Sequence, residues 1–340
     1  MELDLNTIWF ILVGVLFTGY GMLDGFDFGV GALHLMHPTD TDRRLSINSI
    51  GPVWDGNEVW LVTAGGALFA AFPNVYATMF SGFYLAFYLF LTALIFRAVA
   101  IEFRSKEPMA WWRWMWDIAF SVGSILAAVL LGVTAGNIAW GIPVDERGEF
   151  AGSFLGLLNP YALLAGVTTL ALFTMHGAIY LHLKTEGEMQ ARVRAWIRPS
   201  IIFFILSYAL LTLATLLYAP HAADRVREQP VLFVVVALTV LAIANIPREI
   251  FHGRHGWAFV SSCATIALVM SLFAINLYPN MLYSASAPEN SLTIYNGASS
   301  EKTLTIMLVI AVLGMPVVLA YTISIYWIFR GKVQLDETSY

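Results

Sequence analysis

The stretch of sequence that determines the fold class runs from residue 8 to residue 36 and reads IWFILVGVLFTGYGMLDGFDFGVGALHLM. It is longer than the about 20 apolar residues that an α-helix needs to cross a bilayer. Only two charged side chains interrupt it, Asp24 and Asp27. We therefore predict a transmembrane helix that holds two carboxylates within the membrane.

The composition extends this prediction to the whole chain. Hydrophobic residues make up 59% of the 340 residues and charged residues 12%, and the mean hydropathy is +0.72. So few charges cannot cover the surface of a soluble protein of this length, so the excess apolar surface must face lipid. The predicted fold class is an all-α polytopic membrane protein.

Nine segments are long and apolar enough to cross the membrane. The predicted spans are 8–36, 54–72, 75–101, 114–136, 160–183, 200–219, 230–247, 256–278 and 304–329. The second is the most polar, because it opens with Trp54-Asp55-Gly56-Asn57-Glu58. Prolines are expected at several span boundaries, Pro199 and Pro247 among them.

The distribution of basic residues predicts the orientation. With the N-terminus outside, one set of connections holds only four of the 18 Lys and Arg residues, and the other set holds the remaining 14. By the positive-inside rule the N-terminus is periplasmic and the C-terminus cytoplasmic. The acidic start, Met1-Glu2-Leu3-Asp4, lacks the basic region of a signal peptide, so the first span is expected to remain in the mature protein.

Four carboxylates in the first two spans are the candidate functional groups. Asp24 and Asp27 are three residues apart, and Asp55 and Glu58 repeat this spacing, so each pair lies on one helix face. A charge at the centre of the membrane costs about 3 kcal/mol on insertion scales. We therefore expect these acids to line protein or water, where such groups relay protons or hold cations.

The alternative is that the acids are local partners of a basic side chain or of backbone amides at helix ends. Arg97 is the only arginine inside a predicted span; it either pairs with one of the acids or extends to the membrane surface. Gly21, Gly25 and Gly29 form a stripe of small residues that allows another helix to approach closely.

The histidines and the cysteine predict no metal or haem ligands in this chain. Of seven histidines only His176 lies clearly within a span, and it has no evident partner at the same depth for bis-histidine haem ligation. Cys263 is the only cysteine, which excludes a CxxC metal site. We predict no catalytic residue in the chain itself.

Several long strings of sequence resemble a known family. They are LDGFDFGVG at 23–31, NSIGPVWDGNEVW at 48–60 and TAGGALFAAFP at 63–73, with shorter matches at 80–84, 103–106 and 158–160 and a tail that ends at Tyr340. On these strings the chain resembles subunit II of cytochrome bd-type quinol oxidases. The resemblance covers the whole chain and is densest over residues 20–105.

The resemblance implies a single transmembrane domain over residues 1–340, with a first helical bundle at about 8–136 and a second bundle plus a peripheral helix at about 160–329. It implies a location in the bacterial inner membrane and a partner, subunit I, that carries haem b558, haem b595 and haem d, or b-type haem in place of haem d. Quinol is oxidised and O2 reduced to water in that partner. Some members also have a small single-span accessory subunit or a structural quinone. Nucleic acid is not an expected partner.

The resemblance also implies what this subunit contributes. It supports assembly of subunit I and supplies part of a proton path from the cytoplasm, so that a proton motive force forms without pumping. Asp24 and Asp55 are the first candidates for this path, and Asp27, Glu58 and Glu102 are further ones. Glu58 stands where some members have glutamine, and the loops after the sixth and eighth spans are compact.

Two other functions stay open on the sequence. A proton-coupled secondary transporter would also need acids in a glycine-rich span, but no inverted repeat or matched pair of broken spans is visible. A purely structural assembly subunit would use its acids only for local ion pairs.

Overall fold

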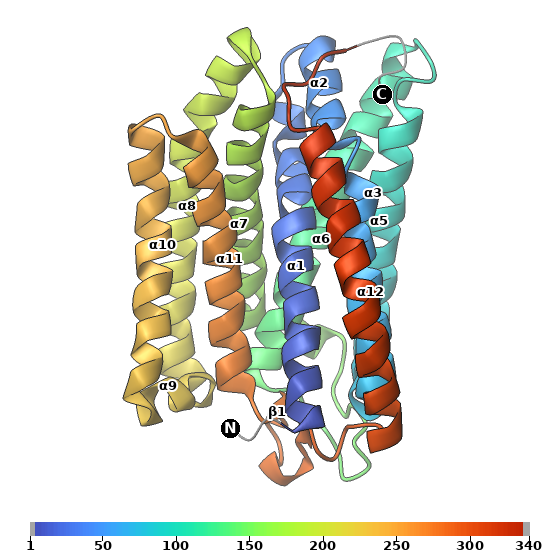
Figure 1. Cartoon of the computed structure of the whole chain (residues 1–340), viewed down its shortest axis with the longest axis vertical. Helices are drawn as coiled ribbons and strands as arrows, with labels where there is room; N and C mark the ends of the chain where they lie inside the picture. The colour runs from blue at the N-terminus through green and yellow to red at the C-terminus, as the bar shows by residue number, and fades with distance from the viewer. Residues whose placement is uncertain (1–3, 336–340) are drawn as a thin grey trace.

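The computed structural model describes residues 4–335 and consists mainly of long α-helices that run side by side (Figure 1). The long helices are α1 (Leu5–Leu33), α3 (Trp54–Ala71), α5 (Tyr84–Phe103), α6 (Ala110–Trp140), α7 (Pro160–Lys184), α8 (Gly187–Tyr218), α10 (Phe233–Phe251), α11 (His255–Leu277) and α12 (Glu301–Ile328). The short helices are α2 (Asp40–Ile50), α4 (Pro73–Gly82), α9 (Asp224–Glu228), η1 (His34–Met36), η2 (Leu155–Leu158), η3 (Pro220–Ala223), η4 (Pro230–Leu232) and η5 (Pro288–Asn290). The strands β1 (Asn280–Leu282) and β2 (Leu292–Thr293) pair antiparallel.

The all-α polytopic fold that the composition predicts is confirmed. Within residues 4–335, eight helical segments are long and apolar enough to cross a membrane. The segment at the predicted second span, α3, is not among the eight, because Asp55 and Glu58 make its first turns polar. It nevertheless packs along α1 with the other long helices.

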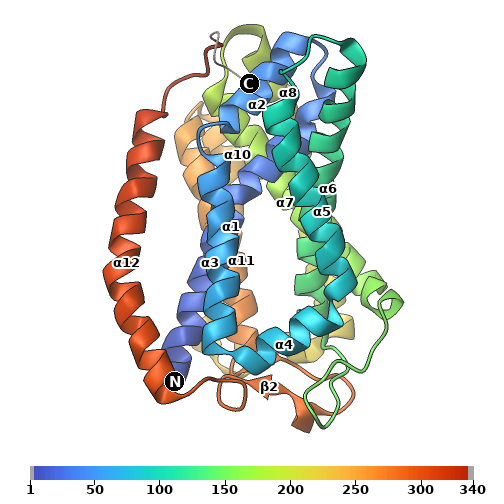
Figure 2. The ribbon, with the colours of Figure 1, turned by 90° about the vertical axis from the view of Figure 1, so that its right-hand side faces the viewer.

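Two details of the predicted boundaries are wrong. The predicted span 75–101 is divided: the backbone of Phe83 leaves helical geometry (φ −99°, ψ 15°), and α4 turns across the lower end of the bundle before α5 rises from Tyr84 (Figure 2). Pro199 and Pro247 lie inside α8 and α10 rather than at their ends. A proline removes a single backbone donor, which a long membrane helix tolerates when its surroundings satisfy the freed carbonyl.

Helix α1 lies at the centre of the molecule and contacts α3, α6, α7 and α11. It meets α7 most closely at Gly29 and Gly177, where a methyl group added to Gly29 would overlap the carbonyl oxygen of Phe173. Gly25 faces the ring of Phe173, and Gly21 lies near Ile266 of α11. Main-chain contact of this kind requires residues without a Cβ.

The two ends of the bundle differ. Helix α1 begins at the lower end in Figure 1, and α1, α7 and α12 all terminate at the other, which we call the upper end. The strands lie at the lower end, where Ile142 of the α6–α7 connection pairs with Ser284. The upper end carries α2 and the basic α5–α6 and α10–α11 connections. This is the end that the charge count predicts to be cytoplasmic.

Candidate functional site

Four charged side chains meet inside the helix bundle: Asp24 and Asp27 of α1, Glu58 of α3 and Arg97 of α5, here called the membrane ion cluster. Asp24, Asp27 and Arg97 are completely buried. Arg97 binds Asp24 through both guanidinium nitrogens, with Nη2 2.5 Å from Oδ1 and Nη1 3.2 Å from Oδ2. Its Nη2 is 3.7 Å from Oδ2 of Asp27, and its Nη1 is 3.9 Å from Oε2 of Glu58.

This geometry decides between the two alternatives for Arg97, which pairs with acids and does not extend to the membrane surface. The ring of Phe28, one residue beyond Asp27, lies 4.4 Å from the guanidinium carbon and adds a cation–π contact. A bidentate charge-assisted contact fixes both orientation and charge. Asp24 is therefore the acid that Arg97 contacts most directly.

Asp27 has different surroundings. Its Oδ2 accepts a hydrogen bond of 2.8 Å from Nδ2 of Asn57, and its Oδ1 has no hydrogen-bond partner among residues 4–335. Asn57 also donates to the carbonyl of Leu23 and accepts a hydrogen bond of 2.8 Å from the hydroxyl of Tyr326. A line of hydrogen bonds therefore joins α12, α3 and the buried carboxylate.

The sequence did not single out Asn57 or Tyr326. Asn57 could have been found, since it stands between the two acids that open α3. Tyr326 carried no signal, because it lies 269 residues further along the chain and only the fold brings α12 beside α3.

The structure does not bring Asp55 and Glu102 into the membrane ion cluster. Asp55 is exposed in the first turn of α3, where a negative charge is favourable at the helix N-terminus. Glu102 is half-buried near the upper end of α5. Within the described part of the chain neither forms an ion pair. Asp55 is one helical turn from Glu58, whose side chain is 21% exposed, so the two acids extend from the surface towards the cluster.

A second buried charge network lies at the upper end and surrounds Asp117 of α6. Its Oδ1 is 2.6 Å from Nε2 of His34 and 2.5 Å from Nε of Arg104, and its Oδ2 accepts from Arg43 at 3.0 Å. Burial opposes the charge of Arg104, but the hydrogen bonds to Asp117 and Asp40 outweigh it and raise the pKa of Arg104. The network ties α2, α5 and α6 together.

The sequence analysis missed this network. Asp117 is a single acid near the start of the predicted fourth span, and an arginine on either side of a short connection precedes it, at 104 and 113. One acid close to two arginines at a span boundary was the signal in the sequence for this ion-pair network.

Two buried histidines occupy contrasting sites. His176 uses both ring nitrogens within the chain, Nδ1 with Ser262 at 2.7 Å and Nε2 with the carbonyl of Met22 at 3.0 Å. Neither nitrogen is free to bind an iron. His37 packs against Trp196, and neither of its nitrogens has a hydrogen-bond partner in the described range 4–335. Burial lowers the pKa of His37 to about 4, so the ring is neutral near pH 7.

The chain matches known proteins along nearly its whole length. The model of the family described as "Cytochrome bd terminal oxidase subunit II" matches residues 5–329. "Cytochrome bd-I ubiquinol oxidase subunit 2" of Escherichia coli (strain K12) is 38% identical over 98% of this chain and 96% of its own length. "Cytochrome bd ubiquinol oxidase subunit 2" of Bacillus subtilis (strain 168) is 37% identical over 98% of both chains.

The fold has a solved counterpart. A chain of the bd oxidase from Geobacillus thermodenitrificans superimposes with a TM-score of 0.79 over 96% of this chain and 98% of that one, at 18% identity. The family model and the curated relatives thus confirm the resemblance noted in the sequence, and the solved structure confirms the fold. This multi-pass membrane protein belongs to the cytochrome bd terminal oxidase subunit II family.

Proposed function

We propose that this chain is subunit II of a quinol:oxygen oxidoreductase in a bacterial inner membrane, with a haem-bearing subunit I as its partner. The curated relatives are named as subunits of ubiquinol oxidases, which supports this assignment. Haems held by the partner would supply electron transfer and oxygen reduction. His176, the histidine that the sequence places clearly within a span, does not fit an axial haem ligand, since both of its ring nitrogens are already hydrogen bonded.

We infer that the membrane ion cluster passes protons to the oxygen-reducing site. Reducing one O2 to two waters consumes four protons and four electrons. Two quinols supply the four electrons as they are oxidised, and they release four protons of their own. When the consumed protons enter from the cytoplasm and the quinol protons leave outside, a membrane potential forms without pumping. The orientation predicted from the basic residues places the upper end, and with it Asp55, on the cytoplasmic side.

The observation that carries the inference is the charge imbalance of the cluster. Three carboxylates share one guanidinium, so full ionisation would leave two uncompensated negative charges in a buried site. Repulsion and desolvation oppose that state, and bound protons relieve it. Because Arg97 binds Asp24 through two nitrogens and reaches Asp27 and Glu58 only at 3.7 and 3.9 Å, Asp27 and Glu58 are the groups placed to exchange protons. Asp55 would receive them at the surface, and Asp24 would fix the position of Arg97.

The assignment is tested first on the complex as it exists. Purified with its natural partners, the chain should be accompanied by a haem-bearing subunit, and the preparation should show haem absorption and quinol-driven oxygen uptake. A colourless preparation of the chain alone, without oxygen uptake, would contradict the oxidase assignment and favour the transporter.

The proton path is tested by Asp27→Asn, which keeps the hydrogen bond to Asn57 but cannot carry a proton. We expect oxygen uptake to fall by about a hundredfold, the lower part of the range for losing a proton-transfer group, while haem content stays normal. Glu188→Gln, at an exposed position on α8, is the matched control. Normal turnover of Asp27→Asn in a fully haem-loaded complex would remove Asp27 from the path.

We further propose that subunit I covers the outer face of α3. Asp55, Val59, Val62, Gly66 and Phe69 follow one another at helical spacing and are all exposed. A carboxylate and a bare glycine backbone on one stripe suit close contact with another helix better than contact with lipid. No neighbouring atom from the described residues lies within 4 Å of a methyl group added at Gly66.

A further inference from the structure

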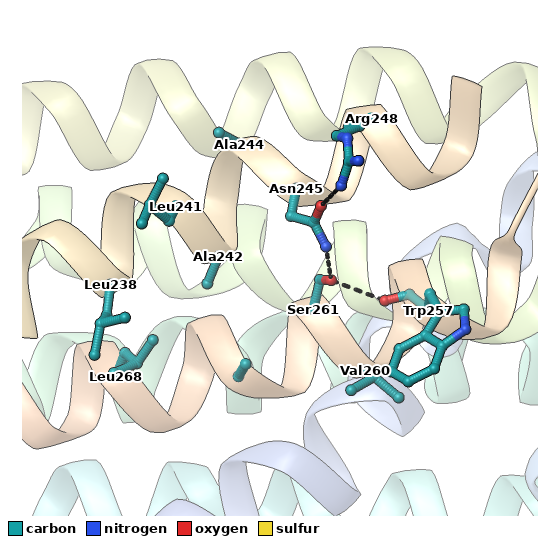
Figure 3. A pocket seen from close by; sticks show the side chains of 11 residues that line it. Leu238, Leu241, Ala242, Ala244, Asn245, Arg248, Trp257, Val260, Ser261 and Leu268 are labelled. Carbon is teal, nitrogen blue, oxygen red and sulfur yellow. Dashed lines mark hydrogen bonds between the residues drawn. The ribbon is translucent and has the colours of Figure 1, made fainter. Parts of the chain in front are cut away.

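A groove of about 630 Å³ runs between α10 and α11 on the outer surface of the bundle, away from both charge networks (Figure 3). These helices are weakly buried: in their most apolar windows, 11% of the α10 segment and 28% of α11 are covered by the rest of the chain. The volume is within the range of sites that bind small molecules. The groove therefore offers room for a ligand from the membrane.

The groove is apolar at one end and polar at the other, as Figure 3 shows. Leu238 and Leu241 of α10 and Leu268 of α11 line the apolar end. Small residues, Ala242 and Ala264, form its floor and leave it open. An unbranched hydrocarbon chain fits such a surface.

The polar end is ordered by a line of hydrogen bonds. Arg248 donates to Oδ1 of Asn245 at 3.0 Å, Asn245 donates to the hydroxyl of Ser261 at 2.9 Å, and Ser261 donates to the carbonyl of Trp257 at 2.8 Å. The side chain of Arg248 is 62% exposed. The line therefore positions a guanidinium at the mouth of the groove with donors still directed outward.

The polar end of the groove carries one positive charge that no carboxylate balances among the three side chains described below. Glu249 is buried, and Arg254 binds both of its oxygens, with Nη2 2.8 Å from Oε1 and Nε 2.7 Å from Oε2. Arg248 makes only a longer contact of 3.3 Å to the same carboxylate. Two guanidinium groups and one carboxylate sum to a net charge of +1, and the less engaged of the two cations is the one in the groove.

The depth of the groove matches one leaflet of a bilayer. From Leu238 to Arg248 the helix rises about 15 Å, which is half of the roughly 30 Å hydrocarbon core. Trp257 lies at the same end as Arg248, as aromatic residues do at the membrane–water interface. A cation at headgroup depth above an apolar channel is complementary to a lipid with a negatively charged headgroup.

We propose that the α10–α11 groove binds one anionic phospholipid from the leaflet at the upper end. Its phosphate would lie on Arg248 and the Asn245 amide, beside the Trp257 ring, and an acyl chain would follow Leu241 and Leu268 towards the membrane centre. The bound lipid would fill the space between the two helices that the rest of the chain covers least.

The test uses the complex with its natural partner, reconstituted into nanodiscs of equal parts phosphatidylglycerol and phosphatidylethanolamine, with bound lipids counted by native mass spectrometry. The wild-type complex should retain phosphatidylglycerol in preference to phosphatidylethanolamine. Arg248→Gln should reduce that preference about fivefold, the contribution of one arginine near an anionic surface. Ala264→Phe keeps the charge but fills the floor of the groove, so it should lower the retention of both lipids.

Arg330→Gln is the matched control, because Arg330 is also an arginine beside a tryptophan at the upper end, but it lies after α12 and outside the groove. It should leave the lipid preference unchanged. Equal preference in the wild-type and Arg248→Gln complexes would overturn the proposal, as would an equal loss in Arg330→Gln. Retention of a quinone in the groove, or cross-linking of position 264 to another subunit, would also overturn it.

Discussion

At the scale of single residues, the chain keeps charge in the membrane by surrounding it with charge of the opposite sign. Arg97 compensates Asp24 directly and Asp27 and Glu58 at a distance, and Arg104 and Arg43 do the same for Asp117. A buried pair of this kind gains little over a hydrophobic pair, yet losing one partner leaves an unpaired charge. On our proposal, the acids of the membrane ion cluster are kept for proton transfer rather than for stability.

Because losing one partner of a buried pair costs more than losing both, a double variant should be more stable than the single one. Arg97→Met should lower the free energy of unfolding of the complex by about 3–5 kcal/mol, because the buried Asp24 and Asp27 lose the one cation that pairs with them among residues 4–335. Adding Asp24→Leu removes one of these carboxylates and should recover at least half of the loss. The measurement is the thermal denaturation of the purified complex, with Arg330→Met as an exposed control. A double variant no more stable than Arg97→Met would show that the two side chains are not coupled.

The lowered pKa of the buried His37 gives a prediction of how the stability of the complex depends on pH. Its pKa is lowered from 6.5 to about 4, so the denatured chain binds a proton more readily than the folded one. The stability from this site is present above pH 6.5 and is lost as the pH falls through 6.5 towards 4, by about 3 kcal/mol in total. His34, Asp42, Arg43 and Arg192 face the same ring and contribute charges of both signs.

His37→Phe keeps the contact with Trp196 and removes the titration. Denaturation midpoints between pH 7 and pH 4.5 should therefore fall less in this variant than in the wild-type complex. Parallel curves for the two proteins would mean that another group controls the acid response.

The sequence predicted the members of the candidate site better than their roles. Asp24, Asp27, Glu58 and Arg97 meet where the spacing and the search for a partner suggested. Their ranking changes, because the sequence could not show that Arg97 reaches Asp24 with both nitrogens and leaves Asp27 less engaged. Asp55 was ranked beside Asp24 because of the family resemblance, and its exposure depends on how α3 is turned.

At the scale of elements, backbone contacts and helix ends hold the bundle together. Lys332 donates to the carbonyls of Leu183 and Thr185 at the end of α7, and Lys184 donates to those of Phe329 and Gly331 after α12. Each lysine thus satisfies free carbonyls at the C-terminus of the other helix. This anchors α12, whose most apolar window is not buried by the rest of the described chain.

The contact between α1 and α7 gives a prediction with an internal control. Gly29→Ala places a methyl group against the main chain of Phe173, so the helices must separate, at a cost of about 1–3 kcal/mol or more. Gly14→Ala, on the same helix, meets no atom of the described residues within 4 Å. The yield of assembled complex should therefore fall for Gly29→Ala and stay normal for Gly14→Ala. Equal yields would mean that α1 can shift without loss.

Hydropathy was sufficient to predict those helices whose outer surfaces face lipid. The long apolar spans from α6 to α12 were found, because lipid imposes length and composition. Their ends differ by a few residues, except that α8 begins at Gly187 and not at the predicted 200. The α4–α5 break was not found, since Phe83 and its neighbours are as apolar as the helices on either side. A turn formed by apolar residues leaves no mark in a hydropathy pattern.

At the scale of the whole molecule, most of the outer surface suits lipid, and one stripe on α3 does not. Eight helical segments suit a lipid environment, whereas α3 displays an acid and a bare glycine along its outer stripe. The division into two four-helix bundles with α12 outside them stays a prediction, as does the cytoplasmic position of the upper end. We propose that subunit I packs against α3 and supplies the contacts that this stripe lacks.

The packing of subunit I on α3 can be tested by substituting two glycines that both have free space beside them in this subunit. No described atom lies within 4 Å of a methyl group added at Gly66 of α3 or at Gly314 of α12, so neither substitution should strain the subunit. If subunit I covers α3, Gly66→Phe should reduce co-purification of subunit I by about tenfold, the effect of roughly 1.4 kcal/mol of lost contact and within the range for overpacking an interface. Gly314→Phe should leave it unchanged. Equal recovery of subunit I with both variants would show that the outer stripe of α3 faces lipid, and the exposed acid at its upper end would then need another explanation.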